Sequence, residues 1–159
     1  MCRVLKNNSQ PSFVEEGLVW QPSASLETLR ERALIISKIR HFFAERNVIE
    51  VETPVLSHAT VTDPHVIGIP AIFQFLGESL EKTMYLQTSP EYAMKRLLAS
   101  GMGSIYQINK AFRQGEVGKI HNPEFTMLEW YRIDFDHYAL MDEMDELLQL
   151  VLKLSLIHI

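Results

Sequence analysis

The sequence is poor in cysteine, in long apolar runs and in basic charge. Its 159 residues include one cysteine, Cys2, which excludes an internal disulfide and a cluster of thiolate metal ligands. No apolar run reaches the roughly 18–20 residues that a bilayer crossing needs. Residues 1–10 lack the apolar centre of a secretory signal. We therefore expect a cytoplasmic protein without a membrane partner.

The charge balance argues against a large nucleic-acid surface. Fifteen Lys and Arg face 20 Asp and Glu, which gives a net charge of −5 and an isoelectric point of about 5.7. A domain that holds a long nucleic acid usually carries a basic face. Extensive tRNA binding by this segment is not expected. Hydrophobic residues make up 47% of the chain, which suffices for a packed core.

The N-terminal third predicts an irregular lead-in, a helix and a strand. Residues 1–20 show no period. The segment Ser23-Ala24-Ser25 offers an N-cap for a helix whose apolar residues recur at helical spacing up to Phe43, and Asn47 suits its left-handed end. Residues 48–54 then alternate with period two, as in a strand, and Pro54 ends it.

The remainder predicts a loop, a helix, a hairpin and a last helix. Residues 56–70 have little period, and 84–87 form a short strand. Ser89, as N-cap, starts a helix that ends near Gly101. Residues 104–112 and 124–132 predict a long antiparallel hairpin. Asp136 caps a helix with an apolar stripe assigned to the core: Leu140, Met144, Leu147, Leu148 and Val151. This order predicts an α+β fold around an antiparallel sheet.

The hairpin concentrates the residue types that carry chemistry. Arg113 can make a bidentate contact with a phosphate, and Phe125 offers a face for a purine ring. A surface hairpin with ordinary charges and a core phenylalanine explains the same residues about equally well. The histidines His41, His58 and His137 have no spacing that suggests a metal site, and no metal ligands are assigned.

Three segments in order resemble class II aminoacyl-tRNA synthetases of the lysyl type. Residues 112–116 followed by 121–131, Phe-Arg-Gln-Gly-Glu and His-Asn-Pro-Glu-Phe-Thr-Met-Leu-Glu-Trp-Tyr, resemble the family's motif 2. The first helix and residues 51–54, Val-Glu-Thr-Pro, resemble motif 1, the dimer element. Between them lie 89–92, Ser-Pro-Glu-Tyr, and 95–97, Lys-Arg-Leu. The similarity covers Trp20 to about Val151 and implies a class II antiparallel sheet flanked by helices.

Two departures favour the elongation factor P–lysine ligases within this family. Some 20 residues before motif 1 cannot form the synthetases' anticodon-binding barrel. The segments 59–63, Ala-Thr-Val-Thr-Asp, and 129–132, Glu-Trp-Tyr-Arg, resemble those of the ligases. The resemblance implies that a lysine-like amino acid, β-lysine in the ligases, is activated with ATP to an adenylate. The acyl group then passes to a lysine side chain of elongation factor P, and the enzyme is a homodimer through motif 1.

The resemblance also implies roles for individual residues. Arg113 would be catalytic and bind the α-phosphate and the carboxylate, while Phe125 would stack on adenine. The other implied ATP-binding residues are His121, Asn122, Glu129 and, on the adenine side, Glu116. The implied amino-acid-binding residues are Ser89, Glu91 and Tyr131. Magnesium is a candidate ion, with Glu129 as a candidate ligand. Ser89 and Glu91 could also serve only to start a helix.

Some features depart from the family pattern. Motif 2 usually has an acidic residue two positions after its arginine, where this chain has Gly115. No glycine follows Gly118, so a glycine-rich motif 3 is missing, and 154–159 do not resemble the family. We therefore expect residues 21–153 to be a partial, incomplete catalytic domain that is inactive alone. A fragment of a lysyl-tRNA synthetase and a non-catalytic dimerising paralogue remain alternatives.

Overall fold

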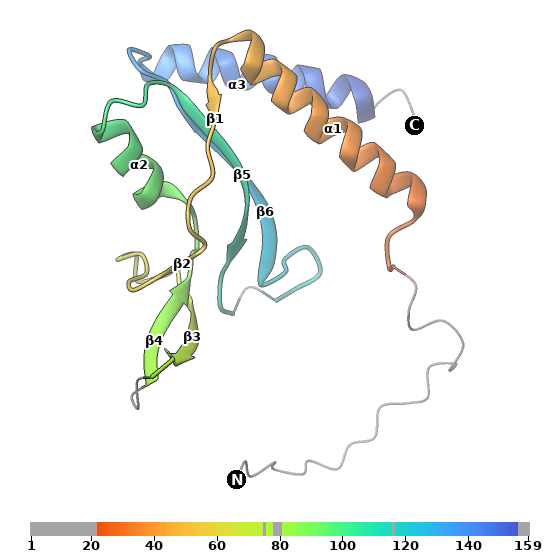
Figure 1. Cartoon of the computed structure of the whole chain (residues 1–159). Coiled ribbons are helices and arrows are strands. Elements are labelled where there is room, and N and C mark those ends of the chain that lie inside the picture. The colour runs from red at the N-terminus through yellow and green to blue at the C-terminus, as the bar shows by residue number, and fades with distance from the viewer. Residues whose placement is uncertain (1–21, 75, 78–80, 116, 156–159) are drawn as a thin grey trace, which may run out of the picture. The chain divides into compact units, whose positions relative to one another are not determined.

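The computed structural model describes residues 22–74, 76–77, 81–115 and 117–155. The predicted lead-in of residues 1–20 and positions 156–159 of the predicted tail lie outside this part. The chain divides into two compact units, Met1–Leu34 and Ile35–Ile159. The boundary falls inside helix α1, Leu26–Glu45. All the remaining helices and strands belong to the second unit, which also carries the candidate site (Figure 1).

The ends of α1 follow the predicted local signals. Ser25 Oγ accepts a hydrogen bond from the Thr28 amide at 3.1 Å, so Ser25 caps the helix as the sequence predicts. After the helix, Asn47 has a φ of 53°, the left-handed conformation that asparagine tolerates better than most residues. The chain can therefore turn back immediately into the first strand.

The first sheet has the order β1-β5-β6, from Ile49–Glu50, Ile105–Phe112 and Glu124–Tyr131. β5 and β6 form the predicted antiparallel hairpin, in register from Ile105↔Tyr131 to Phe112↔Glu124. The predicted strand 48–54 is only two residues long and pairs parallel to β5, so the prediction was wrong in length. The Val51 amide still donates to the Tyr106 carbonyl at 2.9 Å, and beyond it Thr53 contacts β5 through its side chain, which donates to Gln107.

A second sheet has the order β2-β4-β3, from Leu56–Ser57, Glu81–Leu86 and Ile69–Gln74, with both pairings antiparallel. The predicted loop over 56–70 was therefore wrong at both ends. Pro70 lies within β3, which is compatible with a strand at the edge of a sheet. Together the elements form a mixed α and β fold with mainly antiparallel sheets, which confirms the predicted class.

Helices α2, Glu91–Ala99, and α3, His137–Ser155, complete the second unit. Asp136 caps α3 as predicted, because its Oδ1 accepts from the Ala139 amide at 2.9 Å. Ser89 is not the N-cap of α2: that position is Pro90, without a side-chain cap bond. The helix thus begins one residue later than predicted, and Ser89 Oγ accepts from the Glu91 amide at 3.3 Å.

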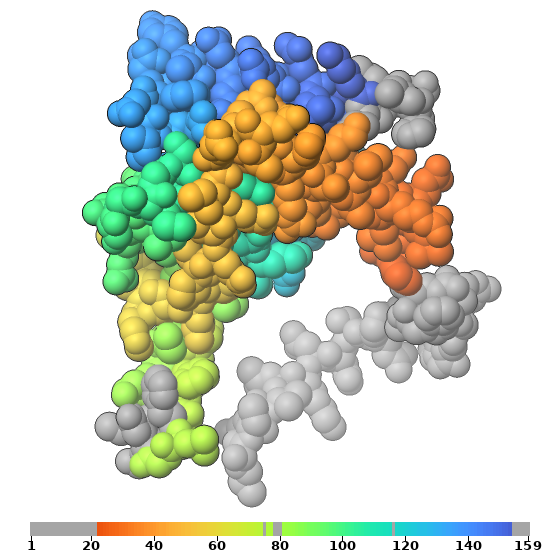
Figure 2. Space-filling view, turned by 45° about the horizontal axis from the view of Figure 1, so that its top comes forward, coloured from red at the N-terminus to blue at the C-terminus, as the bar shows by residue number. Residues whose placement is uncertain are grey.

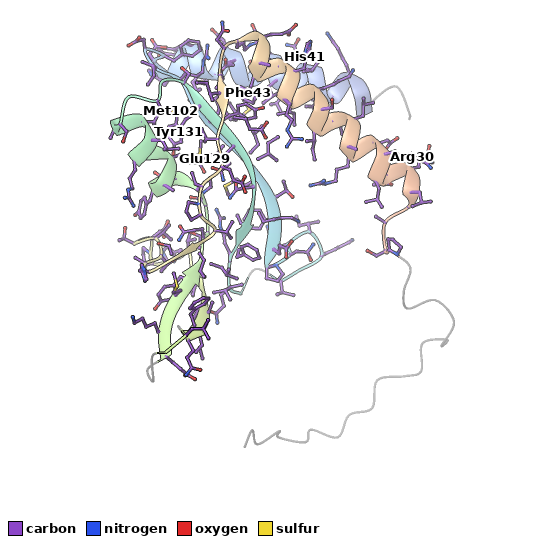
Figure 3. All side chains as sticks on the ribbon, in the orientation of Figure 1. Arg30, His41, Phe43, Met102, Glu129 and Tyr131 are labelled. Atoms are coloured by element: carbon purple, nitrogen blue, oxygen red, sulfur yellow. The ribbon has the colours of Figure 1, made fainter. Side chains whose placement is uncertain are left out.

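The core lies between the β5–β6 hairpin and helices α1 and α3. Phe43 is fully buried and stacks on Tyr106, with ring centroids 4.5 Å apart, and Trp130 and Leu147 belong to the same packing. Figure 3 shows Phe43, from the part of α1 in the second unit, facing the sheet, and Arg46 just after α1 donates to Glu146 of α3 at 2.7 Å (Figure 2).

The apolar stripe of α3 is only partly core, contrary to prediction. Leu147 is 4% exposed and Val151 packs against the core, whereas Leu140, Met144 and Leu148 are exposed.

Candidate functional site

The two faces of the hairpin differ in chemistry. Tyr106, Ile108, Leu128 and Trp130 point to the helical core. The alternate cross-strand pairs lie on the opposite face of the hairpin. Among them, Gln107 is opposite Glu129 and Ile105 is opposite Tyr131. Because strand residues alternate between faces, Gln107, Glu129 and Tyr131 share this second face, which we call the polar face.

Glu129 and Tyr131 form the tightest pair on the polar face (Figure 3). The Tyr131 hydroxyl donates to Glu129 Oε1 at 2.6 Å. Burial raises the pKa of Tyr131, and its hydrogen bond to Glu129 and the charges of Glu129 and Glu91 raise it further. The phenol therefore stays protonated at neutral pH and remains a donor. Its bond fixes the Glu129 carboxylate on the face of the sheet.

Helix α2 brings a second carboxylate to this face. Glu91 follows the turn closed by Ser89, and Lys95 Nζ donates to Glu91 Oε1 one helical turn further on. The pKa of Lys95 is raised by its hydrogen bond to Glu91, by the Glu91 charge and, more weakly, by Glu129. Glu91, Glu129, Tyr131 and Lys95 thus form one electrostatically coupled group, which we call the acidic cluster.

Arg113 lies at the end of β5, next to Phe125. Its guanidinium carbon is 5.2 Å from the centroid of the Phe125 ring. Its Nε donates to the Thr88 carbonyl at 3.3 Å, and its amide donates to the Pro123 carbonyl at 2.9 Å. Arg113 therefore links the segment before α2 to the hairpin, and its charged end is held beside an aromatic ring.

The loop between β5 and β6 contains the remaining predicted nucleotide residues. Gly118 and His121 form a bridge across it, and Gly115 has a φ of 82°. His121 and Asn122 are exposed on this loop. Glu116 lies outside the described residues. The structure therefore brings Arg113 and Phe125 together and leaves His121 and Asn122 at the surface beyond them.

Three residues of this region escaped the sequence analysis. Lys95 joins the acidic cluster, and its position four residues after Glu91 on a helix was a readable signal. Gln107 is 2% exposed, and its Oε1 accepts from Thr53 Oγ1 at 3.0 Å. Thr88 is 1% exposed and supplies the carbonyl to Arg113. The last two depend on contacts between distant segments, which no local pattern reveals.

The residues present do not assemble a set of metal ligands. Within the described ranges, no three His, Cys, Asp or Glu side chains converge. Glu129, the candidate ligand, accepts the Tyr131 hydrogen bond, and its role toward magnesium stays a prediction. No step of the chemistry proposed below is therefore assigned to magnesium.

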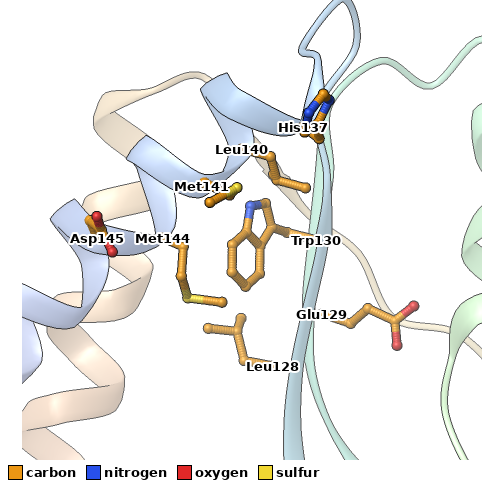
Figure 4. Close-up of a pocket in the computed structure, with 8 residues that line it drawn as sticks. All are labelled: Leu128, Glu129, Trp130, His137, Leu140, Met141, Met144 and Asp145. Carbon is orange, nitrogen blue, oxygen red and sulfur yellow. The ribbon is translucent and has the colours of Figure 1, made fainter.

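A pocket of about 590 Å³ lies on the opposite, apolar side of β6. Figure 4 shows Trp130 between the leucine and methionine side chains of α3 and β6, while the Glu129 side chain points away from them. The lining is Leu128, Glu129, Trp130, His137, Leu140, Met141, Met144 and Asp145. The pocket borders the acidic cluster at Glu129, whose side chain points away from the other lining residues. Among the described helices, none is both long enough and apolar enough to cross a membrane.

The hairpin with its arginine, aromatic ring and acidic cluster has the residues of a class II synthetase motif 2. The profile of the family described as tRNA synthetases class II (D, K and N) matches residues 17–158. The chain belongs to this family, as its three motifs predict.

Its similar curated relatives narrow the comparison further. The chain is 63% identical over 134 residues to an elongation factor P–(R)-β-lysine ligase of Vibrio parahaemolyticus. It is 58% identical to the protein of the same name from Pseudoalteromonas translucida and 55% identical to that from Yersinia enterocolitica. The matches cover 84–87% of the chain and 42–43% of the relatives. The chain thus spans about two fifths of their length.

Proposed function

We propose that the chain is part of a ligase that activates a lysine-like amino acid with ATP and transfers it to elongation factor P. The activated amino acid is β-lysine and the acceptor is a lysine side chain. The names of the relatives support both the β-lysine and the acceptor protein. The observation that carries the proposal is that Glu129 and Tyr131 of the acidic cluster lie on the same face of β6 as Phe125, which the Arg113 guanidinium approaches.

The acidic cluster suits the ammonium groups of the amino acid. Glu91 and Glu129 both act on Tyr131 and on Lys95, so the two carboxylates lie within one electrostatic environment. A partly buried ammonium needs a carboxylate partner, because its desolvation is otherwise costly. The fixed Glu129 would bind one ammonium, and Glu91 would bind the other. Tyr131 would orient Glu129, and Ser89 would hold the start of α2.

Arg113 and Phe125 suit the nucleotide. Arg113 Nε donates to the Thr88 carbonyl, which restricts the orientation of the guanidinium, and the guanidinium would bind the α-phosphate. Phe125 would stack on adenine, and the exposed loop residues His121 and Asn122, with Glu116, would close over the nucleotide. In this arrangement the phosphate and the amino acid carboxylate meet at Arg113.

The chemistry requires no protein nucleophile. The substrate carboxylate attacks the α-phosphorus of ATP, a new bond forms between carboxylate oxygen and phosphorus, and pyrophosphate leaves. The acceptor amine then attacks the acyl carbon, forms an amide and releases AMP. Arg113 would neutralise the charge that develops on the α-phosphate. Positioning of the two substrates supplies the rest of the acceleration.

We further propose that these 159 residues bind substrates but do not turn them over, since they contain no glycine-rich motif 3.

The homodimer would form through motif 1. Ile49 on β1 supports this surface, because it is 47% exposed at the edge of the first sheet. Sedimentation of the chain and of an Ile49→Lys variant tests it: a dimer that the variant dissociates is expected, and a monomeric parent chain would contradict it.

The test of the proposed site is calorimetry with ATP and with a non-hydrolysable lysyl-adenylate analogue. We expect saturable binding by the chain and at least about tenfold weaker binding by Arg113→Ala, since a charge-assisted phosphate contact is lost. Arg40→Ala is the matched control, because Arg40 pairs with Glu50 away from the hairpin loop. Equal affinity of Arg113→Ala and the parent chain would refute the nucleotide site.

A further inference from the structure

Lys95 places an ammonium group of the chain itself on the carboxylate proposed for the substrate. Its Nζ donates to Glu91 Oε1, across one turn of α2. The two side chains are 56% and 41% exposed. An exposed pair of this kind stabilises a helix only weakly, so a ligand can break it at little cost. The contact is therefore well suited to exchange.

The acidic cluster also gives Lys95 a second partner. Glu129 acts on Lys95 electrostatically, although Glu129 is on β6 and Lys95 is on α2. A lysine released from Glu91 therefore stays within the field of another carboxylate. Lys110, which pairs with Glu124 at 2.9 Å across the hairpin, provides a comparison outside the acidic cluster.

We propose that Lys95 is an internal counter-ion. It pairs with Glu91 when the site is empty and is displaced by the terminal ammonium group of the substrate. This inference rests on the proposed function, because it takes Glu91 as the ammonium ligand. Lys95 then determines specificity, because a ligand that offers only one ammonium contact must compete with the Lys95 ammonium for Glu91. Only a ligand that makes further contacts, such as those with Glu129 and Arg113, displaces it effectively.

Two consequences distinguish a counter-ion from a lysine that merely stabilises α2. Removing the charge of Lys95 makes the site more negative, so cationic ligands bind more tightly. The gain should shrink as salt increases, because partly exposed charges are screened. A purely structural role would instead leave ligand affinity unchanged or weaken it, with no difference between charged and neutral ligands.

The test is an NMR titration of the 159-residue chain with L-lysine and with norleucine, which lacks the terminal ammonium. We expect Lys95→Met to bind L-lysine about three- to tenfold more tightly at low salt, from the lost competition and the lost like charge. Norleucine affinity should not change. Lys95→Arg keeps the charge and should behave like the parent chain, as should the matched control Lys110→Met.

A Glu91→Gln variant separates the two proposals. If Glu91→Gln weakens L-lysine binding but Lys95→Met does not tighten it, the counter-ion inference is wrong and the proposed site stands. If Glu91→Gln binds L-lysine as the parent chain does, the proposed amino acid site is wrong and the inference fails with it. Thermal unfolding of each variant checks that it is folded; should Lys95→Met unfold, a weaker affinity of Lys95→Arg than of the parent chain would overturn the inference.

Discussion

Each face of the β5–β6 hairpin has a carboxylate beside it, and the two carboxylates differ in their partners. On the side of the helices, Glu143 of α3 is 5% exposed, accepts from Trp130 Nε1 at 3.0 Å and lies 3.3 Å from Arg132 Nε. On the polar face, Glu129 accepts from the neutral Tyr131 hydroxyl. Glu143 is thus neutralised by the protein's own cation, whereas the charge of Glu129 remains available to a ligand.

The difference separates stability from function along a single strand. Leu128 and Trp130 of β6 pack against the core, and Glu129 and Tyr131 between and beside them belong to the acidic cluster. Substitutions at alternate positions of this strand should therefore affect either the free energy of unfolding or ligand affinity. A variant that affects both equally would break the comparison.

The largest effect is expected on the helical face, for Phe43→Ala. Phe43 is fully buried, stacks on Tyr106 and contacts Trp130 at a centroid distance of 5.6 Å. Its removal should lower the free energy of unfolding by about 3–5 kcal/mol, since a large cavity is left. Urea unfolding measures it. Leu148→Ala, at a 47% exposed site of α3, should cost much less, and equal costs would contradict the assigned core.

The second prediction concerns the neutralised carboxylate. Glu143→Ala removes the carboxylate that pairs with the Arg132 guanidinium and leaves the indole N–H of Trp130 without its acceptor. Breaking one side of a buried ion pair should destabilise the chain by about 3 kcal/mol. The comparison is Glu146→Ala, which removes a 61% exposed partner of Arg46 and should cost less than about 1 kcal/mol. A small loss in Glu143→Ala would show that this carboxylate is not as enclosed as its exposure indicates.

These sites also show what the sequence could predict. The helix ends at Ser25, Asn47 and Asp136 depend on neighbouring residues and were predicted correctly. The antiparallel hairpin also follows from local alternation. Of the second sheet, only β4 was predicted in part, as the strand 84–87; β2 was missed because Leu56 pairs with Leu86, thirty residues away.

The candidate site divides in the same way. Motif resemblance identified Arg113, Phe125, Glu129 and Tyr131, and their binding roles remain predictions. It did not reveal that Gln107 would be buried opposite Glu129, because this depends on the register of the hairpin. The exposed part of the α3 stripe was mistaken for core, since periodicity identifies an apolar face without identifying what covers it.

The third prediction moves to the polar face. Tyr131→Phe removes the hydrogen bond that fixes Glu129, so the carboxylate regains rotamer freedom that a ligand must then restrict. The affinity for L-lysine should fall about fivefold, which corresponds to about 1 kcal/mol of side-chain ordering. NMR titration measures it. Tyr106→Phe is the control from the other face and should leave the affinity unchanged; a similar loss in both variants would count against separate faces.

The smallest effect is expected for the Tyr106 phenol on the helical face, at high pH. Tyr106 donates to Glu50 at 2.9 Å, and burial, followed by this bond and the Glu50 charge, raises the pKa of Tyr106 to about 12 from 10.0. Because the pKa is higher in the folded chain, the stabilisation is complete below pH 10 and is lost as the pH rises through 12. Between pH 9 and pH 11 the stability advantage of the parent chain over Tyr106→Phe should shrink by about 1 kcal/mol. Urea unfolding at the two pH values measures this difference. An advantage that stays constant would mean that the Tyr106 hydroxyl is solvated in the folded chain, and that the helical face is more open than its packing around Phe43 implies.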